Sequence, residues 1–300
     1  MKPDATHDTR CSTLGIHGAA FPTPDSSFRT PDSEADPWAA LRRFTAARIA
    51  LGRTGGSPRT ATLLDFRLCH AQARDAVHAP FDAPRLCDEL SAHLHDAGLA
   101  SLFPSPPCRL LTTAVSDRAT FLARPDLGRR LSDASREAVR ANASAWGRRD
   151  LALLVSDGLS AQAALRHAAA TLVPLAARLA ASGWSFFPLF VVPFARVKLQ
   201  DELGELLNAR LTLMLLGERP GLDSPDSLGA YFTHTPRAAC RDADRNCVSN
   251  IRPAGLQPAD AAAKLADLLT RSVQLGTSGV TLKDTGAPSA LLDTDTTRSP

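Results

Sequence analysis

Lysine, net charge and long apolar runs are all scarce in this sequence, and the last two scarcities each exclude a class of protein. Lysine occurs only at Lys2, Lys198, Lys264 and Lys283, and 34 basic against 31 acidic residues leave a net charge of +3. So small an excess gives no electrostatic reason to expect nucleic acid or an anionic membrane as the main partner. The longest apolar stretch, residues 184–194, is too short to cross a bilayer. We therefore expect neither nucleic-acid binding nor membrane association.

The sequence also lacks closely spaced pairs of cysteines. The six cysteines are scattered without a C-x-x-C motif, at Cys11, Cys69, Cys87, Cys108, Cys240 and Cys247. Residues 1–10 contain no apolar run behind a basic segment, so the sequence shows no secretory signal. Without export, free thiols in a reducing cytoplasm are expected rather than a disulfide framework.

The familiar catalytic signatures are absent as well. No G-x-G-x-x-G, G-x-x-x-x-G-K-[ST], G-x-S-x-G or H-E-x-x-H string occurs. His93 and His95 are two residues apart, which does not align them on one helix face, and Cys240 with Cys247 is a weak metal half-site. The mixed charges of residues 241–245 are typical of a solvated face. The sequence thus predicts no catalytic residues and no metal ligands.

The first half of the chain has helical periodicity. Residues 1–35 are rich in Pro, Ser, Thr and Asp and predict a disordered leader. Asp36 and Pro37 predict a helix start, and a second helix is expected over 61–77. We expect a smaller helical N-terminal domain over 36–148.

The second half predicts an α/β domain over 149–284. Short apolar runs at 151–155, 185–192, 211–216 and 279–282 are typical of buried strands, and helices are expected to about 181, over 201–207 and over 258–273. Strands alternating with helices favour a Rossmann-like domain with a mostly parallel sheet. Residues 285–300 predict a flexible tail.

Two loops follow predicted strands, where ligands bind in open α/β sheets. Residues 156–160, Ser-Asp-Gly-Leu-Ser, form either a turn with a helix N-cap or a backbone site for an anion. Residues 217–221, Gly-Glu-Arg-Pro-Gly, form either a solvated turn or a loop that brings backbone and one carboxylate against a flat ligand. From these motifs alone, the chain is an α/β protein with a ligand cleft.

Seven blocks of the sequence, in order, resemble one known family, the ethanolamine ammonia-lyase light chain. They include Asp36-Pro37-Trp38 with Leu41-Arg42-Arg43-Phe44, Leu64-Asp65-Phe66 with His70-Ala71-Gln72-Ala73-Arg74-Asp75, Arg124-Pro125-Asp126-Leu127-Gly128, Val155-Ser156-Asp157-Gly158-Leu159-Ser160, Arg196-Val197-Lys198, Gly217-Glu218-Arg219-Pro220-Gly221, and Ala243-Asp244-Arg245-Asn246-Cys247-Val248-Ser249-Asn250-Ile251. The blocks span about residues 36–284, so the resemblance covers most of the chain.

The resemblance implies a hetero-oligomer in which this chain and a large subunit hold adenosylcobalamin between them. Such an enzyme converts ethanolamine to acetaldehyde and ammonia by a radical mechanism, with the substrate-handling residues on the large subunit. The cofactor carries the radical chemistry, and the protein positions it. This chain alone is expected to be inactive, and the family's base-on mode agrees with the lack of a D-x-H-x-x-G string.

Carried over residue by residue, the family's cobalamin contacts in this chain are Val197, Glu218 and Cys247. Val197 would offer a small apolar surface, Glu218 would accept hydrogen bonds from the corrin's amides, and Cys247 would pack against the macrocycle. If these residues do not contact a cofactor, Val197 is a core valine, Cys247 is an inert buried thiol and Glu218 is part of a solvated turn.

The sequence departs from the family at some points. Asn208 stands where a glycine is expected, although asparagine tolerates left-handed backbone. The leader lacks the amphipathic helix that directs some members into a bacterial microcompartment, which leaves encapsulation open. The alternatives are a Rossmann-like oxidoreductase, and a non-catalytic reactivating or regulatory partner of a cobalamin enzyme.

Overall fold

The computed structural model describes residues 38–45 and 47–284. The expected leader (1–35), tail (285–300) and helix start at Asp36 and Pro37 lie outside the described residues. The contacts divide the chain into two units, residues 1–59 and 60–300. In the first, a 3-10 helix, η1 (Ala39–Phe44), precedes a short hairpin of β1 (Arg53–Thr54) and β2 (Ser57–Pro58). Gly55, with φ +61°, supplies the left-handed backbone of its turn.

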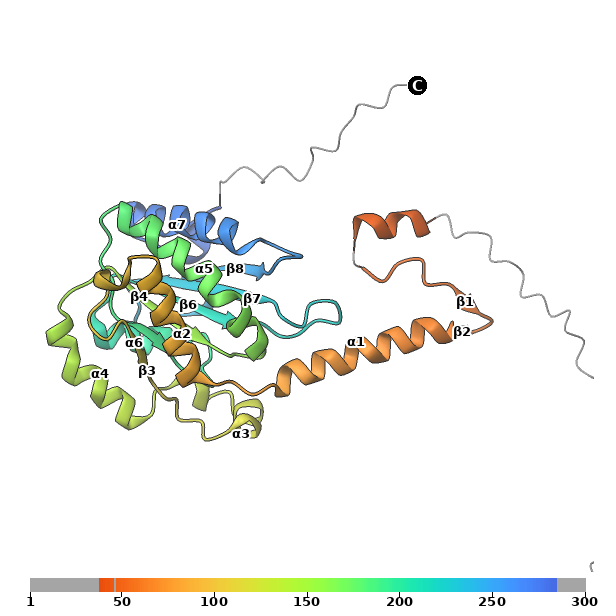
Figure 1. Ribbon diagram of the computed structural model, residues 1–300, viewed down its shortest axis with the longest axis horizontal. Helices are drawn as coiled ribbons and strands as arrows, with labels where there is room; N and C mark the ends of the chain where they lie inside the picture. The colour runs from red at the N-terminus through yellow and green to blue at the C-terminus, as the bar shows by residue number, and fades with distance from the viewer. Residues whose placement is uncertain (1–37, 46, 285–300) are drawn as a thin grey trace, which may run out of the picture. The chain divides into compact units, whose positions relative to one another are not determined.

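A six-stranded sheet with the order β3-β5-β4-β6-β7-β8 forms the centre of the second unit (Figure 1). Its strands are β3 (Cys108–Leu110), β4 (Leu151–Ser156), β5 (Leu189–Val191), β6 (Leu211–Gly217), β7 (Leu228–His234) and β8 (Arg245–Ile251). The first four in the order are parallel, and β7 and β8 add an antiparallel edge. The predicted mostly parallel sheet is confirmed. The antiparallel edge was not predicted, because in β8 only Val248 and Ile251 are buried and the other residues are polar.

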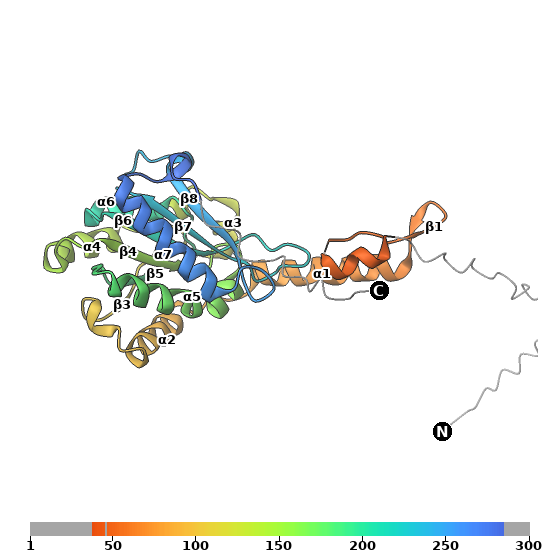
Figure 2. The ribbon, with the colours of Figure 1, turned by 90° about the horizontal axis from the view of Figure 1, so that it is seen from above.

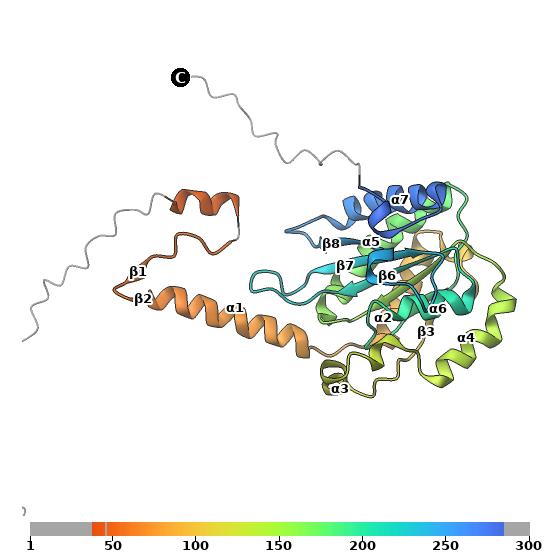
Figure 3. The ribbon, with the colours of Figure 1, turned by 180° about the vertical axis from the view of Figure 1, so that it is seen from behind.

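Helices cover both faces of this sheet. The helices of the second unit are α1 (Thr60–His78), α2 (Ala83–Asp96), α3 (Arg118–Ala123), α4 (Asp133–Trp146), α5 (Ala161–Ala181), α6 (Leu199–Leu207) and α7 (Pro258–Leu275). Shorter 3-10 helices are η2 (Ala100–Leu102), η3 (Leu127–Arg129), η4 (Asp242–Asp244) and η5 (Gly279–Thr281). Helices α2, α5 and α7 lie on one face of the sheet (Figure 2), and α4 and α6 lie on the other (Figure 3). The buried side chains of each group form a cluster with the sheet.

The elements with the strongest sequence signals form as predicted. Every residue of β4 and β6 is buried, as their unbroken apolar runs indicate for central parallel strands. Helix α5 begins behind Ser160, whose hydroxyl accepts the Ala163 N–H. Helix α7 begins with Pro258 at its first position and ends at Gly276 in left-handed conformation. Helix α1 matches the helix predicted over 61–77.

One expectation about the elements is wrong, and a second observation bears on the predicted domains. Leu90 of α2 lies in one buried cluster with Leu153 of β4, so this cluster extends across the boundary predicted near residue 148. Strand β3, only three residues long among prolines, gave no sequence signal, yet it joins this region to the sheet. The last predicted strand, 279–282, is the 3-10 helix η5, because Gly279 adopts a φ of +76°.

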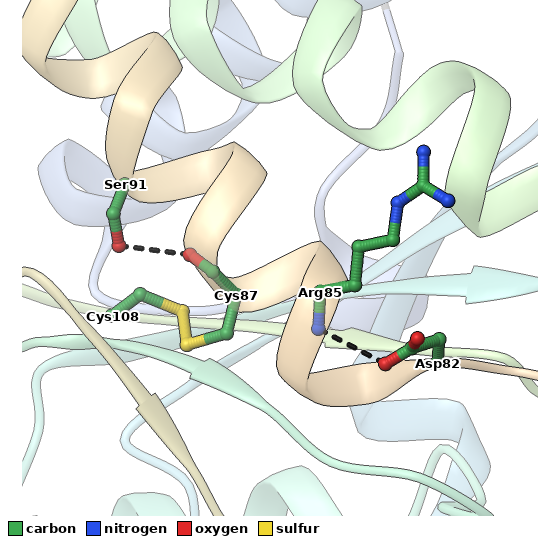
Figure 4. The surroundings of a disulfide bond; sticks show 5 residues. All are labelled: Asp82, Arg85, Cys87, Ser91 and Cys108. Atoms are coloured by element: carbon green, nitrogen blue, oxygen red, sulfur yellow. Dashed lines mark hydrogen bonds between the residues drawn. A yellow bond between two sulfur atoms is a disulfide. The ribbon is translucent and has the colours of Figure 1, made fainter.

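The expectation of free thiols also fails for one pair. Cys87 of α2 and Cys108 of β3 form a disulfide, with 5.7 Å between their Cα atoms (Figure 4). Helix α2 is fixed at its start by Asp82, whose side chain accepts the Arg85 N–H, and Cys87 lies on the helix's buried face. The scattered spacing of the cysteines could not reveal this pair, since the contact arises only when α2 packs beside β3. Cys69, Cys240 and Cys247 are free, as predicted, and Cys11 lies outside the described residues.

None of the helices in the described ranges has the length and apolar content needed to span a membrane.

Candidate functional site

The two loops singled out from the sequence meet at the carboxyl ends of β4 and β6. The Leu159 N–H donates to the Gly217 carbonyl over 2.9 Å. A Cβ atom on Gly217 would lie 2.1 Å from the Ser160 carbonyl oxygen, and one on Gly158 would lie 2.3 Å from that of Gly217. Only glycine at both positions therefore allows the loops to touch. Strand β4 leads through α5 to β5 on one side, whereas β6 leads to β7 on the other, so this is a topological switch point.

The loop of residues 156–160 serves as a structural turn and cap. Asp157 is buried, and its Oδ2 forms a 2.8 Å ion pair with Arg118 while its Oδ1 accepts the Phe194 N–H over 2.7 Å. Burial raises the pKa of Asp157, against the opposing effect of Arg118. The N–H groups of Leu159 and Ser160 bond to Gly217 and Asp157 carbonyls. The structure favours the turn with an N-cap, because the N–H groups of Leu159 and Ser160 are not free for an anion.

Glu218 is held at the start of the second loop. Ser227 Oγ donates to its Oε2 over 2.6 Å, and the Asn250 N–H donates to the same oxygen over 3.2 Å. Within the described residues Oε1 accepts no hydrogen bond. Gly229 leaves room for Oε1, because a Cβ atom at position 229 would lie 2.8 Å from this oxygen. One oxygen of a positioned carboxylate thus remains available as an acceptor.

Cys247 lies opposite Tyr231 in the β7–β8 pairing. Its side chain is exposed at the surface, with Sγ 3.1 Å from Ser249 Oγ. Desolvation raises the pKa of the thiol, against hydrogen bonds with Ser249 and Tyr231 that lower it, and the charge of Glu218 makes a smaller raising contribution. Burial, then Cys247 and Glu218, likewise raises the pKa of the Tyr231 hydroxyl. Both groups are therefore neutral at physiological pH, and Cys247 offers a polarisable, uncharged surface rather than a nucleophile.

Val197 lies in a fixed connection between β5 and α6. The Phe194 and Ala195 N–H groups bond to Asp157 Oδ1 and Ser156 Oγ, and the Arg196 N–H donates to the Gly128 carbonyl over 2.7 Å. Val197 itself is half-buried against the cluster beneath α6. The loop after β4 thus holds the segment that presents Val197.

Two adjoining hollows bring the three predicted residues together. Val197 and Cys247 line an open cavity of about 1450 Å³, and Glu218 lines a neighbouring hollow of about 360 Å³. Arg196 and Tyr231 line both. Sequence reasoning missed these two residues, although Arg196 precedes Val197 in a matching block and Tyr231 is the single tyrosine of the chain. The remaining charged residues around the larger cavity are Asp126, Arg129, Arg130, Arg136, Arg140, Lys198, Glu202, Glu205, Arg241, Asp242 and Arg245.

The charge run of residues 241–245 differs from the solvated face that was predicted. Asp242 is fully exposed, but the Arg245 side chain is only 4% exposed and pairs with the buried Asp201. Lys198 also pairs with Asp201, so two cations share this carboxylate. In the described part of the chain, no three or more His, Cys, Asp or Glu side chains come together in a way that could hold a metal ion.

Comparison with known proteins gives one consistent result. Residues 35–283 match the family model of the ethanolamine ammonia-lyase light chain (EutC). The chain is 52% identical over 259 residues to the ethanolamine ammonia-lyase small subunit of Azotobacter vinelandii, which covers 86% of this chain and 92% of that protein. It is 51% identical to the small subunits of Pseudomonas fluorescens (85% and 89% covered) and Xanthomonas campestris (87% and 92% covered). The chain belongs to the ethanolamine ammonia-lyase light-chain family.

Proposed function

We propose that this chain is the light subunit of an adenosylcobalamin-dependent ethanolamine ammonia-lyase and that it holds the cobalamin against the large, catalytic subunit. The observation that carries the proposal is the convergence of Val197, Glu218 and Cys247, far apart in sequence, on adjoining hollows beside one switch point of the sheet. The family match over residues 35–283 supports the same reaction, the conversion of ethanolamine to acetaldehyde and ammonia.

The residues around these hollows have the chemistry that a corrinoid requires. A corrinoid is a broad, largely apolar macrocycle rimmed with amide side chains. The larger cavity exceeds the ~300–1,000 Å³ usual for small ligands. Val197 and the neutral Cys247 provide an apolar wall, and Oε1 of Glu218 is an acceptor for an amide N–H. When bound, adenosylcobalamin supplies the radical chemistry, whereas these residues bind and orient it.

The cofactor is proposed to stay base-on. Replacement of its own base by a protein histidine is associated with a D-x-H-x-x-G string, which this sequence lacks. No histidine is among the residues that line either hollow. A spectrum of the loaded complex tests this directly, since base-on and base-off corrinoids absorb differently.

The partner is proposed to be the large subunit, as the words "small subunit" in the relatives' names indicate. Helix α1 supports a protein partner, because Leu64 and Leu68, one turn apart, are each 58% exposed. Exposed apolar residues grouped on one face mark protein interaction sites. The cytoplasm is the proposed compartment, with enclosure in a microcompartment left open.

The test is to co-express this chain with the large subunit from the same organism and to measure acetaldehyde release from ethanolamine with and without adenosylcobalamin. Each chain alone serves as a control. Activity that requires both chains and the cofactor is expected. A large subunit that is fully active alone would reject the cofactor-holding role and favour a reactivating or regulatory partner.

A second measurement addresses the site itself. Glu218→Gln keeps the size of the side chain but removes its charge, and Glu218→Ala removes the acceptor. Since a hydrogen bond to a charged group contributes about 1.5–3 kcal/mol, Glu218→Ala is expected to raise the Kd for adenosylcobalamin about tenfold or more. An unchanged Kd in a folded complex would show that Glu218 does not bind the cofactor.

A further inference from the structure

Positive charge on the lining of the larger cavity is only partly compensated. Its acidic residues are already engaged: Glu202 pairs with Arg136, Asp126 pairs with Arg124, and Glu205 accepts the Ala238 N–H. The lining cations without an ion pair to any described residue are Arg129, Arg130, Arg140, Arg196 and Arg241. The cavity therefore presents an excess of guanidinium groups where an anion would be stabilised.

Arg196 is the best placed of these cations. It lines both hollows, directly beside Val197 in the chain. Its guanidinium lies 4.1 Å from the centre of the Phe121 ring, and Nη2 donates to the Phe121 carbonyl over 3.1 Å, so the group is fixed. Its Nε is buried without a hydrogen-bond partner among the described residues. A half-buried guanidinium held in place without a carboxylate is electrostatically incomplete.

The charges around Arg196 also disfavour its cationic form. Desolvation lowers the pKa of Arg196, and repulsion by Arg118, Arg129 and Arg219 lowers it further, against a weaker attraction from Asp157. Arg129, at the end of η3, lines the same larger cavity as Arg196, and the Arg196 N–H donates over 2.7 Å to the carbonyl of Gly128, the residue that precedes Arg129. Among the described residues no carboxylate forms an ion pair with Arg129 or Arg196, and the exposed side chain of Arg129 donates no hydrogen bond there.

We propose that Arg196 and Arg129 bind the phosphodiester in the nucleotide loop of cobalamin, an inference that rests on the proposed function. The phosphodiester is the one anionic group of the cofactor's peripheral structure, and arginine binds phosphate through paired N–H donors. Val197 and Cys247 would contact the macrocycle, and the arginines beside them would take its phosphate. The arginine pair would thereby select complete cobalamins over corrinoids that lack the nucleotide.

Three corrinoids separate this role from a general effect on binding. Adenosylcobalamin contains the phosphodiester and the base, adenosylcobinamide phosphate contains a phosphate without the base, and adenosylcobinamide contains neither. Binding of each to the complex with the large subunit is measured by equilibrium dialysis with absorbance detection. The variants are Arg129→Gln and Arg196→Gln, with Arg178→Gln, an exposed arginine on α5 away from both hollows, as the charge-matched control.

Arg129→Gln is expected to raise the Kd for adenosylcobalamin and for adenosylcobinamide phosphate about tenfold, since one charge-assisted hydrogen bond is lost. The Kd for adenosylcobinamide should not change. Arg178→Gln should change none of the three. Equal weakening of all three corrinoids, or no change in any, overturns the proposal. If the wild-type complex binds none of the three, the cofactor-holding function itself fails, which distinguishes the two outcomes. Because Arg196 also contacts Phe121, Arg129 is the decisive position.

Discussion

At the scale of single residues, Gly229 shows how the absence of a side chain leaves room for the candidate binding residue Glu218. A Cβ atom at this position would lie 2.8 Å from Glu218 Oε1 and 2.9 Å from Tyr231 Cε2. The Glu218 carboxylate is the end of a flexible side chain, so the fold can accept the extra methyl group by moving it. We therefore expect Gly229→Ala to leave the protein folded but to displace the carboxylate.

The measurement is the Kd for adenosylcobalamin in the complex, together with a urea denaturation curve. Gly229→Ala should raise the Kd about tenfold, comparable to losing a hydrogen bond to a charged group. Gly56→Ala is the matched control, because a Cβ there meets nothing within 4 Å. A Kd that stays at the wild-type value would show that Oε1 is not an acceptor for the cofactor.

Asn208 provides a second prediction at this scale. It ends α6 with φ 48° and ψ 41°, so the asparagine predicted to tolerate left-handed backbone in place of glycine does so. Residues with a Cβ pay about 1–2 kcal/mol in this conformation, and asparagine pays less. Asn208→Ala should lower the free energy of unfolding by ~1 kcal/mol, whereas Asn208→Gly should not. Urea titration of both variants checks this, and equal stability of alanine and glycine would contradict it.

At the scale of elements, the Arg118–Asp157 pair joins three parts of the chain. Arg118 is the first residue of α3, Asp157 follows β4, and Asp157 also receives the Phe194 N–H from the segment that leads to Val197. Arg118→Met would leave the buried carboxylate of Asp157 without its cation. We expect this to lower the free energy of unfolding by about 3–5 kcal/mol. A second substitution, Asp157→Asn, should recover part of this loss.

The same variant has a defined pH dependence. Burial already raises the pKa of Asp157, and Arg118 opposes that shift, so removing Arg118 raises the pKa further. A carboxyl whose folded pKa lies above its unfolded value stabilises the fold most at low pH, and this contribution falls as the pH rises through the folded pKa. The loss caused by Arg118→Met should therefore be larger at neutral pH than near the ordinary carboxyl pKa of about 3.9. Urea curves at both pH values test it, and the reverse trend would contradict the assignment.

The elements that could be predicted from the sequence are those whose burial is nearly complete. Strands β4 and β6 and helices α5 and α7 carry unbroken apolar runs or clear cap residues, and they form where expected. Strand β3 was missed because it has three residues, and β8 because it is an edge strand in which only Val248 and Ile251 are buried. Strand β7 is mostly buried, but glycine, threonine and histidine interrupt its apolar residues, so it has no unbroken apolar run. The Cys87–Cys108 pair depends on how α2 packs on β3, which no local pattern specifies.

The candidate site was predictable only in part, for a related reason. Glu218 lies in a loop whose glycine and proline content suggested close approach to a ligand, whereas Val197 and Cys247 came from the family resemblance alone. Arg196, Tyr231 and Gly229 became visible only once the carboxyl ends of β4 and β6 were brought together. Contacts between segments of distant sequence are set by packing, so single-chain patterns do not identify them.

At the scale of the whole molecule, the site is open and incomplete. The cavity that Val197 and Cys247 line faces outward, and the proposed cofactor would be enclosed only when the large subunit covers it. Exclusion of water from radical chemistry requires such closure. Under the proposed function the chain forms one wall of a shared site, and its binding properties should be measured in the complex.

Helix α1 gives the last prediction, because it tests the partnership directly. Of its residues only Ala76 is buried, and Leu64 and Leu68 expose apolar surface one turn apart. Burying such a side chain in an interface contributes roughly 1.5–3 kcal/mol, so Leu64→Ser with Leu68→Ser should reduce co-purification with the large subunit by more than about tenfold. Leu275→Ser, at an equally exposed leucine of α7, is the matched control. If the double variant assembles as the wild type does, α1 is not the docking face, and the large subunit must contact another surface of this chain.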